Sequence, residues 1–141
     1  MKRKIFFSLM VVMLLVLLSI GECQSEHVEE WVPYVPSSQM VDLKFWMFDG
    51  ISYINVSVTF SCAGYKISDW GTPVREKYEM WVDSVVWEWT GPSAQVITTL
   101  FHTYDLGRLE EGNYTFTFMA WNVRVKSINF TIVRANVPSP D

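Results

Sequence analysis

The chain has 141 residues, of which half are hydrophobic and 16% aromatic, and it carries a formal net charge of −4. This length accommodates one domain with a substantial core. A protein that follows nucleic-acid phosphates needs a basic surface, so the acidic balance argues against a nucleic-acid partner.

The first 23 residues have the layout of a secretory signal peptide. A cationic start, Lys2–Lys4, precedes the apolar run 5–20, and Gly21 and Cys23 suit the positions before a cleavage site. We expect cleavage, because the run lies at the short edge of the about 17–25 residues that span a bilayer. The alternative is an uncleaved anchor, which is the only membrane contact that we expect. In both cases the rest of the chain is secreted or lies at the cell surface.

Removal of this segment takes three of 11 basic and one of 15 acidic residues, which leaves 118 residues with a net charge of −6. Such a charge does not favour an anionic membrane surface. After the signal peptide, 1–23, we expect an extended lead-in at 24–39, because its prolines disfavour a central strand. A β-domain at 40–133 and a flexible tail at 134–141 complete the predicted organisation.

Alternation of apolar and polar side chains, which is typical of strands with one buried face, dominates the remainder of the chain. Asp49-Gly50 predicts a two-residue hairpin turn. No segment after the signal helix has a helical period. The fold that we expect is an all-β, antiparallel β-sandwich of seven to eight strands. In chain order, strands are predicted at 41–48, 53–62, 65–70, 78–89, 94–104, 114–121 and 125–133.

Tyr114 opens the penultimate predicted strand and follows a leucine and a turn glycine, Leu109 and Gly112. This arrangement resembles a tyrosine corner, in which the phenol hydrogen-bonds to a nearby backbone group and fixes the connection between sheets. The alternative is a tyrosine that simply begins a strand at the margin of a sheet.

The strand predicted at 78–89 separates two kinds of side chain. Met80, Val82, Ser84 and Val86 share one face, and the other face carries four candidate ligand-binding residues. If the first face is the core, three tryptophans line up on solvent with a carboxylate between them, as in sugar-binding or partner-docking surfaces. The alternatives are that the tryptophans fill the core, or that a neighbour covers them. The four candidates are Trp81, Asp83, Trp87 and Trp89.

Three Asn-Xaa-Ser/Thr sequons begin at Asn55, Asn113 and Asn129. The strand pattern places Asn55 and Asn129 on outward positions and Asn113 in a turn, where an N-linked glycan is sterically allowed. Alternation of Thr, Ser and Asn on exposed strand faces also creates sequons by chance, so the sequence leaves their occupancy open.

The sequence offers no convincing metal, cofactor or catalytic motif. Zinc and redox sites need closely spaced Cys or His residues, which are absent here. Cys62 is interpreted as a buried thiol or, alternatively, as the disulfide partner of Cys23. A nucleophile needs a base and an orienting acid, and the chain has only His27 and His102.

Carboxylates that cleave glycosides work in pairs whose spacing in space a sequence does not reveal. Glu79, Asp83 and Glu88 are more simply interpreted as solvated charges on a strand. We therefore expect no enzymatic activity.

A family resemblance rests on Ser68–Pro73 and Trp89–Ile97, followed by Tyr104–Gly107 and Gly112–Phe116. Together these segments resemble small immunoglobulin-like modules found in secreted and surface proteins of archaea and bacteria. The resemblance covers about 40–133 and implies an immunoglobulin-like sandwich. Its motifs are turn and core residues, so it implies a fold and no functional residues.

These observations predict a non-enzymatic binding or adhesion module, with an unknown protein or glycan at the cell surface as its partner. The first alternative is a carbohydrate-binding protein that uses the tryptophan-lined strand face. A more distant alternative is an extracellular hydrolase or inhibitor.

Overall fold

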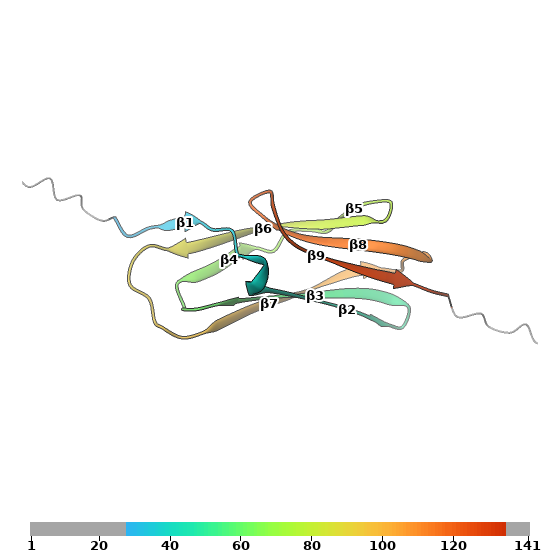
Figure 1. Ribbon diagram of the computed structural model, residues 1–141, viewed down its shortest axis with the longest axis horizontal. Helices are drawn as coiled ribbons and strands as arrows, with labels where there is room; N and C mark the ends of the chain where they lie inside the picture. Colours follow the sequence, from blue (N-terminus) through green and yellow to red (C-terminus); the bar gives the residue numbers. More distant parts are fainter. Residues whose placement is uncertain (1–27, 135–141) are drawn as a thin grey trace, which may run out of the picture.

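The computed structural model describes residues 28–134, which form two β-sheets packed face to face (Figure 1). This confirms the predicted all-β sandwich. The expected signal helix, Cys23, His27 and the last seven residues lie outside the described residues. Within the described part, no helix is long and apolar enough to cross a membrane.

The smaller sheet has the order β2-β3-β7, with antiparallel neighbours, and lies below the larger one in Figure 1. A short 3-10 helix, η1, leads into its first strand. The predicted Asp49-Gly50 turn is confirmed, because both residues have positive φ angles, 49° and 73°, as the tight turns of hairpins require. The bounds are η1 Ser38–Met40, β2 Val41–Phe48, β3 Ile51–Phe60 and β7 Thr98–Gly107.

The larger sheet is organised around β6, which pairs with four other strands. β1, β4 and β5 each run antiparallel to it, and β8 followed by β9 extends the sheet on one flank. The bounds are β1 Trp31–Pro33, β4 Tyr65–Asp69, β5 Val74–Glu76, β6 Glu79–Trp89, β8 Gly112–Ala120 and β9 Val123–Ile132.

The described part of the chain thus has nine strands, whereas the sequence predicts seven or eight. β1 and β5 are additional, and each is too short to show an alternating pattern. Residues 94–97 are not part of a strand. Backbone bonds from the amides of Ala63 and Val96 to the carbonyl of Ala94 fold that segment back before β7 begins. Paired structure begins at Trp31, inside the segment expected to be a lead-in.

The expectation of wholly antiparallel pairing is wrong for β6 and β8, which are parallel from Glu79↔Thr115 to Ser84↔Ala120. After β6 the chain crosses to the smaller sheet, forms β7 and returns to the larger sheet. β8 therefore re-enters beside β6 with the same direction. Parallel neighbours need such a crossover, in contrast to hairpin strands.

The core lies between the sheets and consists of the inward side chains of both. A run of stacked rings joins the layers. The ring centroid of Phe45 in β2 lies 4.2 Å from that of Phe130 in β9, which in turn lies 5.5 Å from the ring centroid of Tyr114 in β8. The most deeply buried apolar residues, none more than 1% exposed, are Ile54, Val56, Val58, Phe60, Val82, Val86, Tyr114, Phe116, Phe118 and Ala120.

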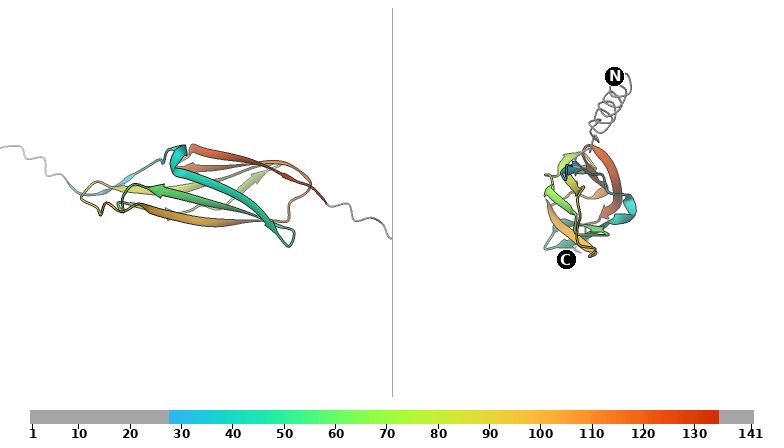
Figure 2. Two further views of the ribbon diagram at one scale, coloured as in Figure 1. Left: turned by 60° about the horizontal axis from the view of Figure 1, so that its bottom comes forward. Right: turned by 90° about the vertical axis from the view of Figure 1, so that its left-hand side faces the viewer.

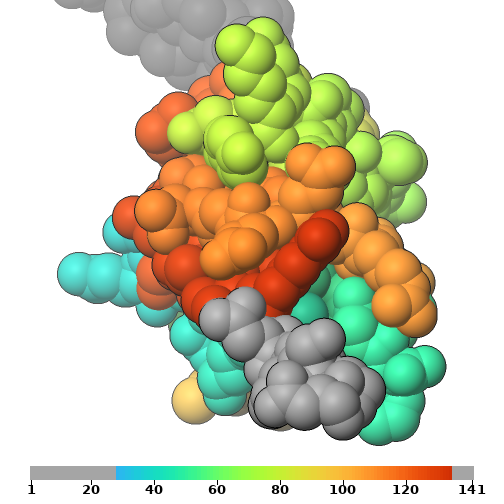
Figure 3. Space-filling model, turned by 90° about the vertical axis from the view of Figure 1, so that its right-hand side faces the viewer, coloured from blue at the N-terminus to red at the C-terminus, as the bar shows by residue number. Residues whose placement is uncertain are grey.

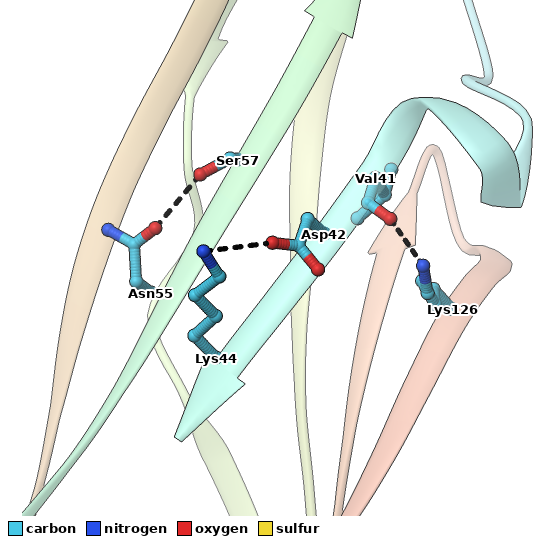
Figure 4. Close-up of polar contacts among 6 residues, drawn as sticks. All are labelled: Val41, Asp42, Lys44, Asn55, Ser57 and Lys126. Atoms are coloured by element: carbon cyan, nitrogen blue, oxygen red, sulfur yellow. Dashed lines mark hydrogen bonds and ion pairs between the residues drawn. The ribbon is translucent and has the colours of Figure 1, made fainter. Parts of the chain in front are cut away.

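Polar contacts fix both long margins of the sandwich, whose elongated shape is seen in Figure 2. On one margin the ammonium group of Lys126 in β9 donates to the carbonyl of Val41 in β2 (Figure 4). On the other, the Tyr104 hydroxyl of β7 donates to the carbonyl of Trp70, just after β4.

The predicted tyrosine corner is confirmed, because the Tyr114 hydroxyl donates to the carbonyl of Glu110 at 2.9 Å.

Two core serines give a matched test of buried hydroxyl groups. Ser52 and Ser84 are both 0% exposed, but Ser84 Oγ donates to the carbonyl of Met119 at 2.8 Å, whereas Ser52 Oγ has no hydrogen-bond partner among residues 28–134. We expect Ser52→Ala to raise the free energy of unfolding and Ser84→Ala to lower it, each by about 1 kcal/mol. Urea unfolding of both variants measures the difference, and a loss of stability in Ser52→Ala would contradict the assignment.

Stability should also fall in alkaline solution. Burial, reinforced by the charge of Asp69, raises the pKa of Tyr104 well above its usual value. The unfolded chain loses this proton near pH ~10 while the folded chain keeps it, so the free energy of unfolding decreases as pH rises above ~10. Burial and a hydrogen bond to Glu88 also raise the pKa of Tyr65.

Tyr104→Phe should therefore reduce this alkaline slope without abolishing it. At neutral pH the variant lacks the hydrogen bond to Trp70, so its free energy of unfolding is lower than that of the parent protein by about 1 kcal/mol. This difference in the free energy of unfolding becomes smaller as pH rises. Tyr53→Phe on the outer face is the control, and urea unfolding at neutral and alkaline pH is the measurement. An unchanged slope in Tyr104→Phe would contradict the prediction.

Candidate functional site

The structure resolves which face of β6 is the core. Met80, Val82, Ser84 and Val86 are buried, so the candidate residues at 81, 83, 87 and 89 lie on the outer face of the larger sheet. The three tryptophans are half-buried and Asp83 is exposed. They share a face but occupy separate environments, because they are spread along an eleven-residue strand.

Trp87 is held by its neighbours. Its ring meets Trp121 edge-on with 4.8 Å between centroids, and its Nε1 donates to Ser68 Oγ at 2.9 Å. The Trp121 Nε1 in turn donates to the carbonyl of Val86 at 2.7 Å. These contacts hold Trp121 at a φ angle of 51°, which is unusual for a bulky residue. Trp87 therefore supports the β8–β9 turn.

Asp83 has a structural role at the same turn. Its Oδ1 accepts a hydrogen bond from the backbone amide of Asn122 at 2.8 Å, and Asn122 has a φ angle of 61°. A carboxylate that accepts from a backbone amide makes one of the stronger hydrogen bonds in proteins. Side chains of β6 thus hold the two turn residues, Trp121 and Asn122, in their positive-φ backbone conformation.

Trp89 belongs to a third environment at the end of the sheet. Its ring packs against Trp31 of β1 at 5.4 Å, and Lys66 Nζ lies 4.0 Å from the centroid of the Trp31 ring. A pocket of about 320 Å³ opens between these rings and the loops that flank them. None of the described residues that line this pocket is charged. The lining residues are Trp31, Ala63, Gly64, Trp89, Pro92, Ser93 and Ala94.

Trp81 alone lies in a groove with both aromatic and charged groups. The groove has a volume of about 540 Å³ and crosses the outer face from β5 to β9. Figure 3 views the end of the sandwich where the β5–β6 hairpin, in yellow-green, stands beside β8, in orange. The lining residues are Glu76, Glu79, Met80, Trp81, Thr115, Thr117, Met119 and Arg124.

The charges of this groove are not neutralised by neighbours. Glu76 and Glu79 are direct cross-strand partners, an arrangement of like charges that destabilises a sheet. The only ion pair within residues 28–134 joins Lys44 and Asp42 on the other sheet (Figure 4). Glu76, Glu79 and Arg124 therefore remain available to a ligand. A locally unfavourable pair that the fold retains is a pointer to function.

Sequence reasoning missed Glu76 and Arg124 because their strands do not reveal which partners they face. β5 is three residues long, and the register of β8 with β9 shifts between Phe118 and Met119, which brings Arg124 opposite Met119. The available signal was the Glu-Lys-Tyr-Glu sequence at 76–79, in which two carboxylates flank two residues of a tight turn.

Two of the three sequons form a reciprocal pair on the outer face of β8 and β9. Thr131 Oγ1 donates to Asn113 Oδ1 at 2.8 Å, and Thr115 Oγ1 donates to Asn129 Oδ1 at 2.9 Å. Both asparagines are exposed, so each Nδ2 can project into solvent. The third sequon differs, because Asn55 is half-buried.

Asn55 uses both ends of its amide within the smaller sheet. Its Oδ1 accepts from Ser57 Oγ at 2.9 Å (Figure 4). Its Nδ2 donates to Thr103 Oγ1 at 3.1 Å. A glycan on this nitrogen would have to share it with an existing contact.

Other reactive side chains are dispersed. Within the described ranges, no three His, Cys, Asp or Glu residues lie close enough to hold a metal ion. His102 is exposed and stacks on Trp70 at 5.5 Å, and Cys62 is half-buried, with its Sγ accepting from Ser93 Oγ at 3.3 Å.

No protein-family model, curated protein or solved structure matches this chain. The geometry of the groove beside Trp81 is therefore the basis for any functional proposal.

The structural role of Asp83 can be tested against Glu79, a carboxylate on the same strand that makes no side-chain hydrogen bond within the described part of the chain. We expect Asp83→Ala to lower the free energy of unfolding by about 1–2 kcal/mol, because the Asn122 amide loses a charged acceptor. Glu79→Ala should change it by less than about 0.5 kcal/mol. Urea unfolding provides the comparison, and equal effects of the two substitutions would refute the role.

Proposed function

We propose that this chain is a non-enzymatic, secreted or surface-associated binding module that holds a carbohydrate in the groove beside Trp81. The observation that carries the proposal is the combination of an indole ring with unpaired carboxylates and a guanidinium in one groove. The sequence pattern of an N-terminal signal peptide supports the extracytoplasmic location.

A sugar ring fits this combination of groups. Its C–H faces are apolar and pack on an aromatic ring, while its rim carries hydroxyl groups that both donate and accept. Glu76 and Glu79 accept hydrogen bonds and Arg124 donates them, while the Thr115 hydroxyl, whose proton goes to Asn129 Oδ1, can accept one. Thr115 lines the groove beside these charges. Specific binding needs such placed polar groups around an apolar surface.

The charge of the site favours a neutral sugar. Two carboxylates stand at the β5–β6 hairpin and one guanidinium stands on β9, so the groove itself is acidic, as is the whole chain. An anionic ligand such as a phosphate or a uronic acid would be repelled at the Glu76–Glu79 end. A neutral oligosaccharide at the cell surface is the ligand that these groups suit best.

The site is smaller than a platform of three tryptophans. Trp87 is engaged by Ser68 and Trp121, and Trp89 lines a separate pocket. Trp81 is thus the single aromatic residue proposed to contact the sugar. One ring and a few polar groups are consistent with weak individual binding that many copies at a surface would reinforce.

The reciprocal sequons lie beside the groove and share Thr115 with its wall. A glycan on Asn113 or Asn129 would therefore stand next to the proposed ligand. Binding is best measured first on protein produced without glycans and then on protein secreted from a glycosylating host.

We expect Trp81→Ala to weaken the binding of a neutral oligosaccharide, first identified on a glycan array, by about tenfold or more, which equals at least ~1.4 kcal/mol. Trp46→Ala is the matched control, because Trp46 also lies on an outer face, where it is 40% exposed, but belongs to the smaller sheet. Isothermal titration calorimetry of both variants gives the affinities. Glu76→Gln should weaken binding as well.

Two outcomes would overturn the proposal. One is the absence of any glycan ligand on the array, and the other is equal binding by Trp81→Ala and the parent protein. A third outcome would change the interpretation. If the protein cleaves a bound oligosaccharide, and if Glu76→Gln or Glu79→Gln abolishes this cleavage, the protein is a glycoside hydrolase, because such enzymes need two carboxylates.

A further inference from the structure

The four margins of the two sheets are protected to different degrees. β2 and β9 face each other and are bridged by Lys126, which donates to the Val41 carbonyl. β5 has three residues, and β4 has an irregular register between Ile67 and Asp69. Short, irregular or covered edges prevent pairing with other chains.

β7 is longer and more regular than β4 and β5, and the hydrogen bond from its Tyr104 hydroxyl to the Trp70 carbonyl engages a side chain and not its backbone. It has ten residues, pairs with β3 alone, and contains no proline, lysine or arginine. Its one irregularity lies at the Gly107 end. The Gly107 amide donates to Asp105 Oδ1 within β7 itself, and no backbone group of β7 bonds to a described residue outside its own sheet. The edge thus offers free amide and carbonyl groups.

The side chains of β7 also leave an apolar group uncovered. Phe101 is 70% exposed on the outer face, with threonines two positions away on either side, Thr99 and Thr103. An exposed aromatic ring beside unpaired backbone groups suits an added strand, which would cover the ring and satisfy the backbone together.

We propose that β7 pairs antiparallel with β7 of a second copy of this chain, about a two-fold axis at Phe101. The two three-stranded sheets would then form one six-stranded sheet. In this register Phe101 faces its own counterpart, Thr99 faces Thr103, and Leu100 faces His102. A two-fold interface uses the same patch on both partners, so the patch must be complementary to itself.

The charge pattern supports a second copy as the occupant. Asp105 is the only carboxylate on β7 and lies near one end, so in the proposed register it faces position 97 of the other chain. No like charges oppose each other, and both aromatic and threonine pairs stabilise neighbouring strands. The proposed sugar groove lies on the other sheet and remains open in the dimer.

The test compares two equally exposed phenylalanines on the same outer face. Phe101 is 70% exposed on the edge strand β7, and Phe48 is 73% exposed on β2. The parent protein should sediment as a dimer at high concentration and dissociate on dilution. Phe101→Lys should shift the dissociation constant upward by about tenfold or more, whereas Phe48→Lys should leave it unchanged.

Hydrogen exchange gives a second measurement that needs no substitution. The outward amides of 98–105 should exchange more slowly as the protein concentration rises, while those of β2 should not change. A monomer at every concentration, equal effects of the two lysine variants, or exchange in β7 that is independent of concentration would each overturn the proposal.

Discussion

The structure depends on β6, since four strands of the larger sheet take their position from it. Its alternation sends Met80, Val82, Ser84 and Val86 into the core and leaves Trp81 outside. A slip of one residue would exchange these two sets, which would put indole rings into the core and expose the apolar row. The same periodicity that anchors the sandwich therefore also positions the proposed ligand-binding surface.

The elements that could be predicted are those whose signal is local. Strict alternation located β2, β3, β6, β8 and β9, and Asp49-Gly50 located a turn, because these patterns reflect one buried face or one backbone conformation. The tyrosine corner was equally local, since the Tyr114 hydroxyl reaches only to Glu110. β1 and β5 were not predicted, because a strand of three residues is too short to show an alternating pattern. The parallel pairing of β6 with β8 was not predicted, because the order of strands in a sheet depends on the whole sandwich and not on a local pattern.

The residues of the candidate site were likewise predictable only where their signal is local. The sequence separated the two faces of β6 but left open which of them is the core, and it did not distinguish Trp81 from Trp87 and Asp83, which neighbouring segments engage. Glu76 and Arg124 join Trp81 only through cross-strand register and a bulge. Tertiary pairing thus decides which members of one strand face are free to bind. The groove on the larger sheet and the open edge of the smaller one are separate surfaces, so the proposed ligand binding and the proposed dimerisation need not compete.

The direction of β8 bears on how the chain reaches this structure. The β2–β3 and β8–β9 hairpins join neighbouring segments, and such units form within about 1–10 μs. Met80 and Phe116, in contrast, meet only after the intervening chain has crossed to the opposite layer. Closing that loop costs conformational entropy before any contact compensates for it, which slows folding. We therefore expect the β6–β8 pairing to form after the two hairpins, whose apolar faces stay exposed to solvent until it does.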